Sequence, residues 1–117
     1  MSRRTDALDP RRAARYAAVQ ALYQIEVTGR PATEVVAEFE RHRLDDLFVL
    51  AETGSQSRGV DRDLFQDIVL GAAAREEALD AAVSRHLSAG WSLRRAGFTL
   101  RAMLRAGAYE LAARPET

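Results

Sequence analysis

The residue types best suited to chemistry lie in residues 9–28, a stretch with helical periodicity. Spacings of four, four and three place four side chains on one stripe: Arg12, Tyr16, Gln20 and Tyr23. Arg11 and Arg15 flank this stripe. Guanidinium groups pair with phosphates, phenol rings stack on unpaired bases, and an amide can read a base edge. The pattern therefore suits single-stranded nucleic acid, although tyrosines packed on a neighbouring helix beside solvated arginines would give the same spacing.

The sequence offers little that could support catalysis. His42 and His86 are separated by 44 positions and match no metal-ligand spacing, and no nucleophile elbow, phosphate-binding loop or dinucleotide fingerprint occurs. Adjacent carboxylates such as Glu76 and Glu77 point about 100° apart on a helix, so they do not share a site. We therefore expect neither an enzyme nor a bound metal or cofactor.

Length and composition predict one helical domain. The chain has 117 residues, of which 22 are alanine and none is cysteine, and this favours packed helices without disulfides. No apolar run is long enough to span a bilayer and the N-terminus lacks a signal peptide, so we expect a cytoplasmic protein. Residues 1–15 and 94–117 each carry a net charge of +3 and residues 16–93 carry −6, which can separate an anion-binding surface from a surface for a basic partner.

Hydrophobic periodicity and capping residues predict an all-α bundle of about five to six helices. Residues 1–8 are expected to be flexible, and residues 9–117 to form the domain. The expected helices cover residues 9–28, 33–43, 61–74, 75–88 and 99–114, with a short one at 91–96. Asp9, Thr33 and Asp61 are the expected N-caps, and Gly29 ends the first helix. Residues 99–114 are apolar on two opposite sides, which is typical of a central helix that needs cover on both.

Two motifs resemble those of the NusB family of bacterial transcription antitermination factors. The first is RRAARYAAVQALY at residues 11–23. The second comprises GWSLRR at residues 90–95 and LRAGAYEL at residues 104–111. The motifs occur in the family's order and at about its spacing, and the resemblance extends over residues 10–117.

This resemblance implies a non-enzymatic factor that binds boxA, a single-stranded RNA element, together with NusE, a small-subunit ribosomal protein. The pair acts with the transcription elongation complex to promote read-through in rRNA operons. By resemblance, five residues lie at the RNA: Arg11, Arg12, Arg15, Gln20 and Glu116. The stripe pattern adds Tyr16 to this set. Four are assigned to the basic partner: Tyr23, Glu76, Glu77 and Asp80. Arg105 and Trp91 are interpreted as structural.

The family pattern continues into two further C-terminal helices, whereas this sequence ends at Thr117. We therefore expect incomplete cover of the helix at residues 99–114, and hence self-association. Two alternatives stay open at this point. One is a NusB-like RNA-binding domain of an rRNA cytosine methyltransferase, and the other is a protein-interaction bundle with no RNA role.

Overall fold

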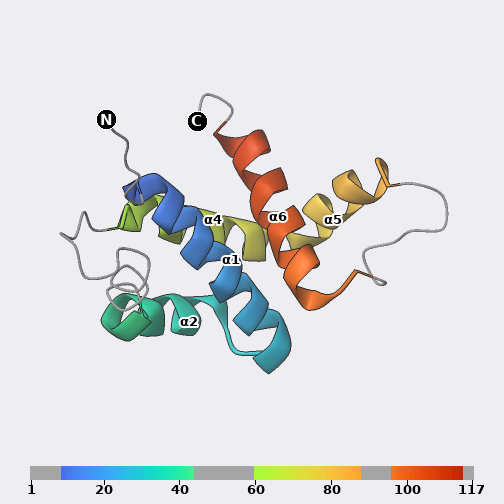
Figure 1. Ribbon diagram of the computed structural model, residues 1–117. Helices are drawn as coiled ribbons and strands as arrows, with labels where there is room; N and C mark the ends of the chain where they lie inside the picture. The colour runs from blue at the N-terminus through green and yellow to red at the C-terminus, as the bar shows by residue number, and fades with distance from the viewer. Residues whose placement is uncertain (1–8, 44–59, 88–95, 115–117) are drawn as a thin grey trace.

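The computed structural model describes residues 9–43, 60–87 and 96–114, and these fold into helices (Figure 1). The elements in chain order are α1 (Pro10–Thr28), α2 (Ala32–Glu38), the π-helical segment η1 (Phe39–Arg43), α4 (Arg62–Ala74), α5 (Glu76–Ser84) and α6 (Phe98–Ala113). The described residues contain no strand, so the predicted all-α class is confirmed. None of the described helices is both long and apolar enough to cross a membrane.

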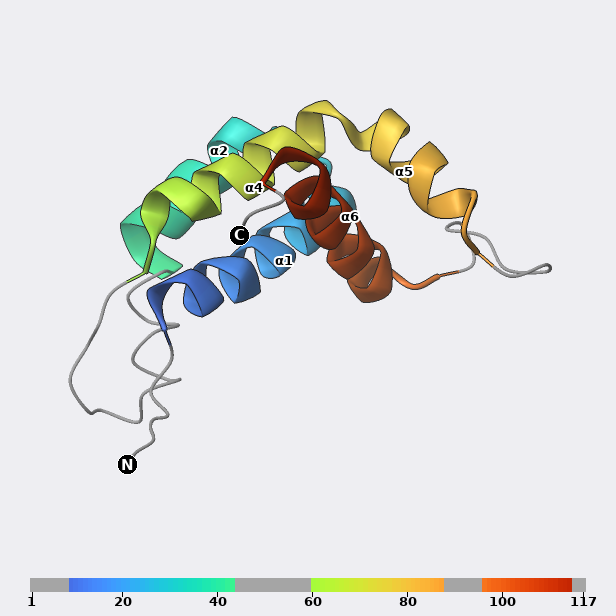
Figure 2. The same cartoon turned by 90° about the horizontal axis from the view of Figure 1, so that it is seen from above.

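Helix α1 is the centre of the packing. It makes its most extensive contacts with α4 and α6, and α2 covers both α1 and α4. Helix α5 follows α4 after one residue and packs mainly on α6, so it extends away from α1 and α2 (Figure 2). The start of α1 and the end of α5 consequently lie at opposite ends of the molecule.

Small side chains let α1 approach its neighbours closely. Its buried face consists of five alanines and one leucine: Ala13, Ala14, Ala17, Ala18, Ala21 and Leu22. The largest fully buried side chains share one core cluster with this face, and they belong to α2, η1 and α4: Val35, Phe39, Leu64, Phe65, Ile68 and Val69. The rings of Phe39 and Phe65 stack with their centroids 5.7 Å apart. Helical spacing in the sequence predicts one apolar face on α1, at Ala14, Ala17, Ala18, Ala21, Leu22 and Ile25, and one on α4, at Leu64, Phe65, Ile68, Val69 and Ala72. Both faces are confirmed, with Ile25 half-buried and the other residues buried.

Two of the three expected N-caps are confirmed and one is wrong. The Asp9 carboxylate accepts a hydrogen bond from the backbone N–H of Arg11 at 2.8 Å, and the Asp61 carboxylate accepts one from Leu64 at 3.0 Å. Thr33 is not a cap, because α2 already begins at Ala32. The preceding Pro31 has φ −62°, and its carbonyl accepts the first two backbone hydrogen bonds of that helix. Helix α1 ends as expected at Gly29, whose φ of +75° favours glycine.

The later boundaries also differ in part from expectation. Helix α5 ends at Ser84, four residues before the predicted end, and continues only as turns. The sequence pattern predicts an apolar stripe on this helix at Ala78, Leu79, Ala82, Val83 and Leu87. Leu79 is buried, the next three are half-buried, and Ala78 is exposed. Because only one of these side chains is fully buried, polar contacts contribute to the position of α5.

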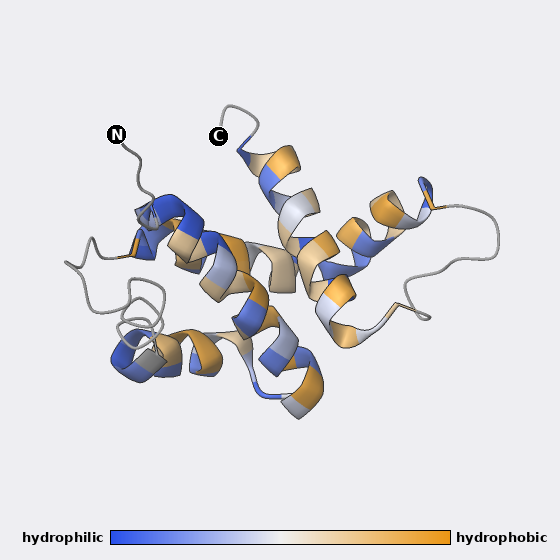
Figure 3. Ribbon diagram, in the orientation of Figure 1, coloured by the Kyte–Doolittle hydropathy of each residue, from blue (hydrophilic) through white to orange (hydrophobic). Residues whose placement is uncertain are grey.

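Helix α6 buries one of its two apolar sides. Ala102, Ala106 and Tyr109 are buried against the bundle, whereas Met103 and Leu111 are 53% and 78% exposed. Figure 3 accordingly shows hydrophobic colouring on the outer turns of α6. The prediction that this helix is apolar on two sides is confirmed, and among the described residues only one side is covered.

Several expectations concern residues outside the described ranges. They are the flexible segment 1–8, the short helix at 91–96 with Trp91, and Glu116. These stay predictions.

Candidate nucleic-acid interface

The stripe predicted along α1 faces outward. Arg11 and Arg12 are exposed in its first turn, and neither forms an ion pair with another described residue. Tyr16 is 54% exposed, Gln20 is half-buried and Tyr23 is 42% exposed. The same helix therefore buries its alanine face in the core and presents cations, rings and an amide to solvent.

Arg15 differs from the two arginines before it. Its Nε donates to both carboxylate oxygens of Glu110 on α6, at 3.0 and 2.8 Å, and its Nη2 lies 2.7 Å from Oε2. The hydrogen bond that Arg15 donates to Glu110 raises the pKa of Arg15 above its ordinary value. The Glu110 side chain is 16% exposed and that of Arg15 39% exposed. Arg15 thus joins α1 to α6 at the edge of the stripe.

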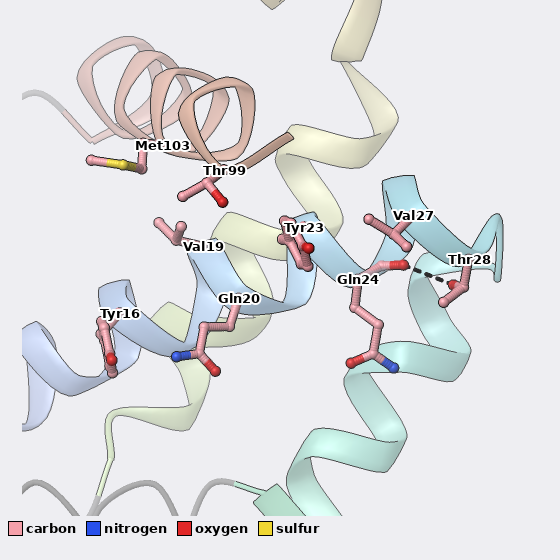
Figure 4. Close-up of a pocket in the computed structure, with 9 residues that line it drawn as sticks. All are labelled: Tyr16, Val19, Gln20, Tyr23, Gln24, Val27, Thr28, Thr99 and Met103. Carbon is pink, nitrogen blue, oxygen red and sulfur yellow. Dashed lines mark hydrogen bonds between the residues drawn. The ribbon is translucent and has the colours of Figure 1, made fainter. Parts of the chain in front are cut away.

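A groove of about 680 Å³ runs beside the tyrosines, between α1 and α6. Its lining residues are Tyr16, Val19, Gln20, Tyr23, Gln24, Val27, Thr28, Thr99 and Met103. Figure 4 shows the first seven of these along α1, with Thr99 and Met103 opposite them on α6. Since Tyr16, Gln20 and Tyr23 all line it, the groove is continuous with the arginine-bearing start of the stripe.

The two tyrosines of the stripe have different surroundings. The edge of the Tyr23 ring packs against Phe98 of α6, with the ring centroids 6.2 Å apart and the planes at 85°. Tyr16 is the more exposed of the two and lies closer to Arg11 and Arg12 along α1. Tyr16 is therefore better placed for a ligand that also contacts the arginines.

Arg105 is the buried cation that links three helices, as the structural interpretation predicts. Its Nε and Nη2 each donate to one carboxylate oxygen of Asp80 on α5, both at 2.7 Å. Nη1 lies 3.3 Å from Glu26 on α1, and Nη2 lies 3.2 Å from Glu76. The hydrogen bond to Asp80 is the main cause that raises the pKa of Arg105, and burial opposes it. This ion-pair group compensates for the small apolar contact of α5.

The acidic residues predicted to meet a basic partner are not equivalent in the structure. Glu76 and Glu77 are exposed in the first turn of α5, whereas both oxygens of Asp80 are occupied by Arg105. Helix α5 lies away from the start of α1 (Figures 1 and 2). The acidic and arginine-bearing surfaces are therefore separate, as the charge distribution along the sequence predicts.

Sequence reasoning missed the carboxylates that organise these arginines. Glu110 is 95 positions from Arg15, and Glu26 is 79 positions from Arg105, so no local spacing pairs them. It also missed a third group, in which Asp67 of α4 accepts hydrogen bonds from the Tyr109 hydroxyl and the Arg114 guanidinium. Both hydrogen bonds lower the pKa of Asp67, and the bond from Tyr109 has the larger effect. The bond between Tyr109 and Asp67 also raises the pKa of Tyr109. No cluster of potential metal ligands occurs among the described residues.

Comparison with known proteins identifies the family. Residues 12–117 match the model of the NusB family. The chain belongs to the NusB family. The resemblance inferred from the two sequence motifs is thereby confirmed.

Two relatives illustrate the similarity. A transcription antitermination protein NusB from Sphingopyxis alaskensis is 44% identical over 104 residues, which cover 89% of this chain and 67% of the relative. The protein of the same name from Caulobacter vibrioides is 42% identical over 105 residues, with the same two coverages. The chain therefore spans about two thirds of the length of these relatives. No solved structure matches it significantly.

The names of these two relatives are relevant to the expectation that the chain is not an enzyme. The relatives are named as transcription antitermination proteins and not as enzymes. The expectation drawn from the missing catalytic motifs agrees with membership of the NusB family.

Proposed function

We propose that this NusB-family chain is a transcription antitermination factor that binds boxA RNA together with NusE and promotes read-through in rRNA operons. The names of its relatives support the antitermination role. This role belongs to the bacterial cytoplasm, where the elongation complex assembles.

The observation that carries the RNA part is the exposed stripe on α1. Arg11 and Arg12 are available for phosphates at the start of the helix, where the backbone N–H groups also favour anions. Tyr16 offers a ring face for an unpaired base, and Gln20 offers an amide beside it. A single strand can follow this row because its bases are not already paired. Arg15 borders the row, and Glu116 stays assigned to the RNA by family resemblance alone.

The partner part rests on a different region. Tyr23 is half exposed next to Phe98, and Glu76 and Glu77 present carboxylates on α5. Acidic side chains suit a basic ribosomal protein. Since Arg105 holds Asp80, we assign Asp80 a supporting role in the partner surface, in which it orients the first turns of α5.

The RNA surface is tested with the Arg12→Ala variant and a fluorescently labelled boxA oligonucleotide. Anisotropy titrations should show weaker binding, by about 1 kcal/mol, and a salt slope shallower by about 0.7, because one phosphate contact is lost. Arg85→Ala is the matched control, since Arg85 is an exposed arginine at the end of α5. Equal affinities of Arg12→Ala and Arg85→Ala at low salt would reject the proposed RNA face.

The partner surface is tested by replacing each of the two tyrosines with alanine in separate variants. Tyr23→Ala should reduce the amount of NusE recovered in a pull-down and change RNA affinity little. Tyr16→Ala should do the reverse, because the two rings lie on different parts of the stripe. Normal NusE recovery by Tyr23→Ala would reject the assignment of Tyr23.

A further inference from the structure

The Glu110 carboxylate forms an ion pair with Arg15 at the border of the proposed RNA surface. The carboxylate meets the Nε and Nη2 edge of Arg15, and a pair of N–H groups of this kind is also what arginine offers to a phosphate. Glu110 is therefore placed where a phosphate oxygen pair would bind if Arg15 were unpaired. The ion pair lies between α1 and α6, and neither group is fully exposed.

Pairing makes the three arginines at the start of α1 electrostatically unequal. Arg11 and Arg12 present their full charge to solvent, since neither pairs with a described carboxylate. The charges of Arg15 and Glu110 cancel at the distance of an approaching strand. A strand that reaches the stripe consequently gains the attraction of two cations and not of three.

We propose that Glu110 is a functional residue of the RNA surface, which neutralises Arg15 and thereby limits how much phosphate contacts contribute to affinity. The inference rests on the proposed function, because it concerns the same surface. Phosphate contacts are the same for every RNA sequence, whereas contacts to bases are not. When the phosphate contribution is limited, base contacts by the ring of Tyr16 and the amide of Gln20 supply a larger share of the binding free energy, and the specificity for the RNA sequence increases.

The test compares the full chain with Glu110→Gln in salt titrations of labelled boxA RNA. The amide oxygen of glutamine can still accept a hydrogen bond from Arg15, so the helix contact is kept while the negative charge is removed. We expect binding at 50 mM salt to become roughly three- to tenfold tighter, since one charge-assisted phosphate contact becomes available. The salt slope should steepen by about 0.7, which makes the affinity fall by an additional factor of about 2.6 between 50 and 200 mM salt.

Two control variants and a control RNA distinguish the role of Glu110 from a general effect of charge. Glu34→Gln removes the same charge from another surface ion pair, that of Arg30 and Glu34 at 2.8 Å, and should leave RNA affinity unchanged. The double variant Arg15→Gln/Glu110→Gln has no charge at either position, so its affinity and salt slope should match those of the unmodified protein. A scrambled RNA of equal length should gain as much affinity from Glu110→Gln as boxA does.

Two results would overturn the proposal. One is equal or weaker binding by Glu110→Gln that has retained its thermal stability. The other is a double variant as weak as Arg15→Gln alone, since Arg15 would then be a phosphate ligand despite its partner. If Glu110→Gln unfolds, the double variant decides the matter by itself. A failure of the proposed function differs from both, because then Arg12→Ala would also bind like the unmodified protein.

Discussion

Gly71 lies directly beneath the ring of Tyr109, and its replacement by alanine should destabilise the fold although alanine is the better helix former. A Cβ atom at position 71 would come 2.5 Å from the Tyr109 hydroxyl oxygen and nearer still to ring atoms Cζ and Cε1. Ordinary carbon contacts are about 3.5–4.0 Å. The ring is buried, and its hydroxyl is bonded to Asp67, so it cannot move aside without breaking that bond.

The size of the effect is a balance of three contributions. Overpacking in a core costs about 2 kcal/mol. Loss of a hydrogen bond to a carboxylate costs about 1.5 kcal/mol. The higher helix propensity of alanine returns about 1 kcal/mol. The expected net loss for Gly71→Ala is about 2.5 kcal/mol, which corresponds to a decrease in Tm of about 10 °C for a domain of this size.

The assay is thermal and urea unfolding followed by circular dichroism, with Gly107→Ala as the matched control. Gly107 is also inside a helix, but apart from its chain neighbours and the backbone of its own helix no atom lies within 4 Å of a Cβ built there. Gly107→Ala should therefore raise the free energy of unfolding by up to about 1 kcal/mol. Equal effects of the two substitutions, or a stabilised Gly71→Ala, would refute the close-contact reasoning.

Three further predictions concern the ion pairs and the apolar surface. Arg105→Leu should lower the free energy of unfolding by about 2 kcal/mol in urea titrations, less than for a fully buried ion pair because the carboxylates around it are partly solvated; an unchanged midpoint would contradict this. Since the pKa of Asp67 is lowered in the fold, its stabilising contribution is present above the unfolded pKa of about 3.9 and is lost as the pH falls through the folded value. Asp67→Asn should thus flatten the acid limb of a stability–pH curve, and an acid limb as steep as that of the unmodified protein would exclude this role. Sedimentation should reveal concentration-dependent association, reduced by Leu111→Gln because Leu111 is 78% exposed on the uncovered side of α6; a monomer at all concentrations would oppose it.

Much of the fold follows from local patterns that a sequence displays directly. Alanines at helical spacing define the buried face of α1, and the apolar residues of α4 define a second one. Asp9, Gly29 and Asp61 mark helix ends through bonds to their own near neighbours. The predicted start of α2 at Thr33 was wrong, because the Pro31 carbonyl accepts the first hydrogen bonds of the helix and α2 begins at Ala32.

The candidate site divides in the same way. The outward stripe of Arg12, Tyr16, Gln20 and Tyr23 follows from helical geometry together with a buried alanine face on the opposite side. Its partners do not follow, because Glu110 reaches Arg15, and Phe98 reaches Tyr23, only after α6 crosses α1. Spacing along the chain is silent on contacts between residues 75 or more positions apart.

The amino-acid sequence by itself determined the helices, the family and the side of α1 that carries chemistry, because each depends on residues within a few turns of one another. Only the tertiary structure decided which charges remain available. Arg11, Arg12 and Arg15 have the same side chain in neighbouring positions, yet within the described part of the chain packing brings a carboxylate to Arg15 alone among the three. Electrostatic interactions depend on distance in space, and for these groups that distance is set by how α6 lies across α1.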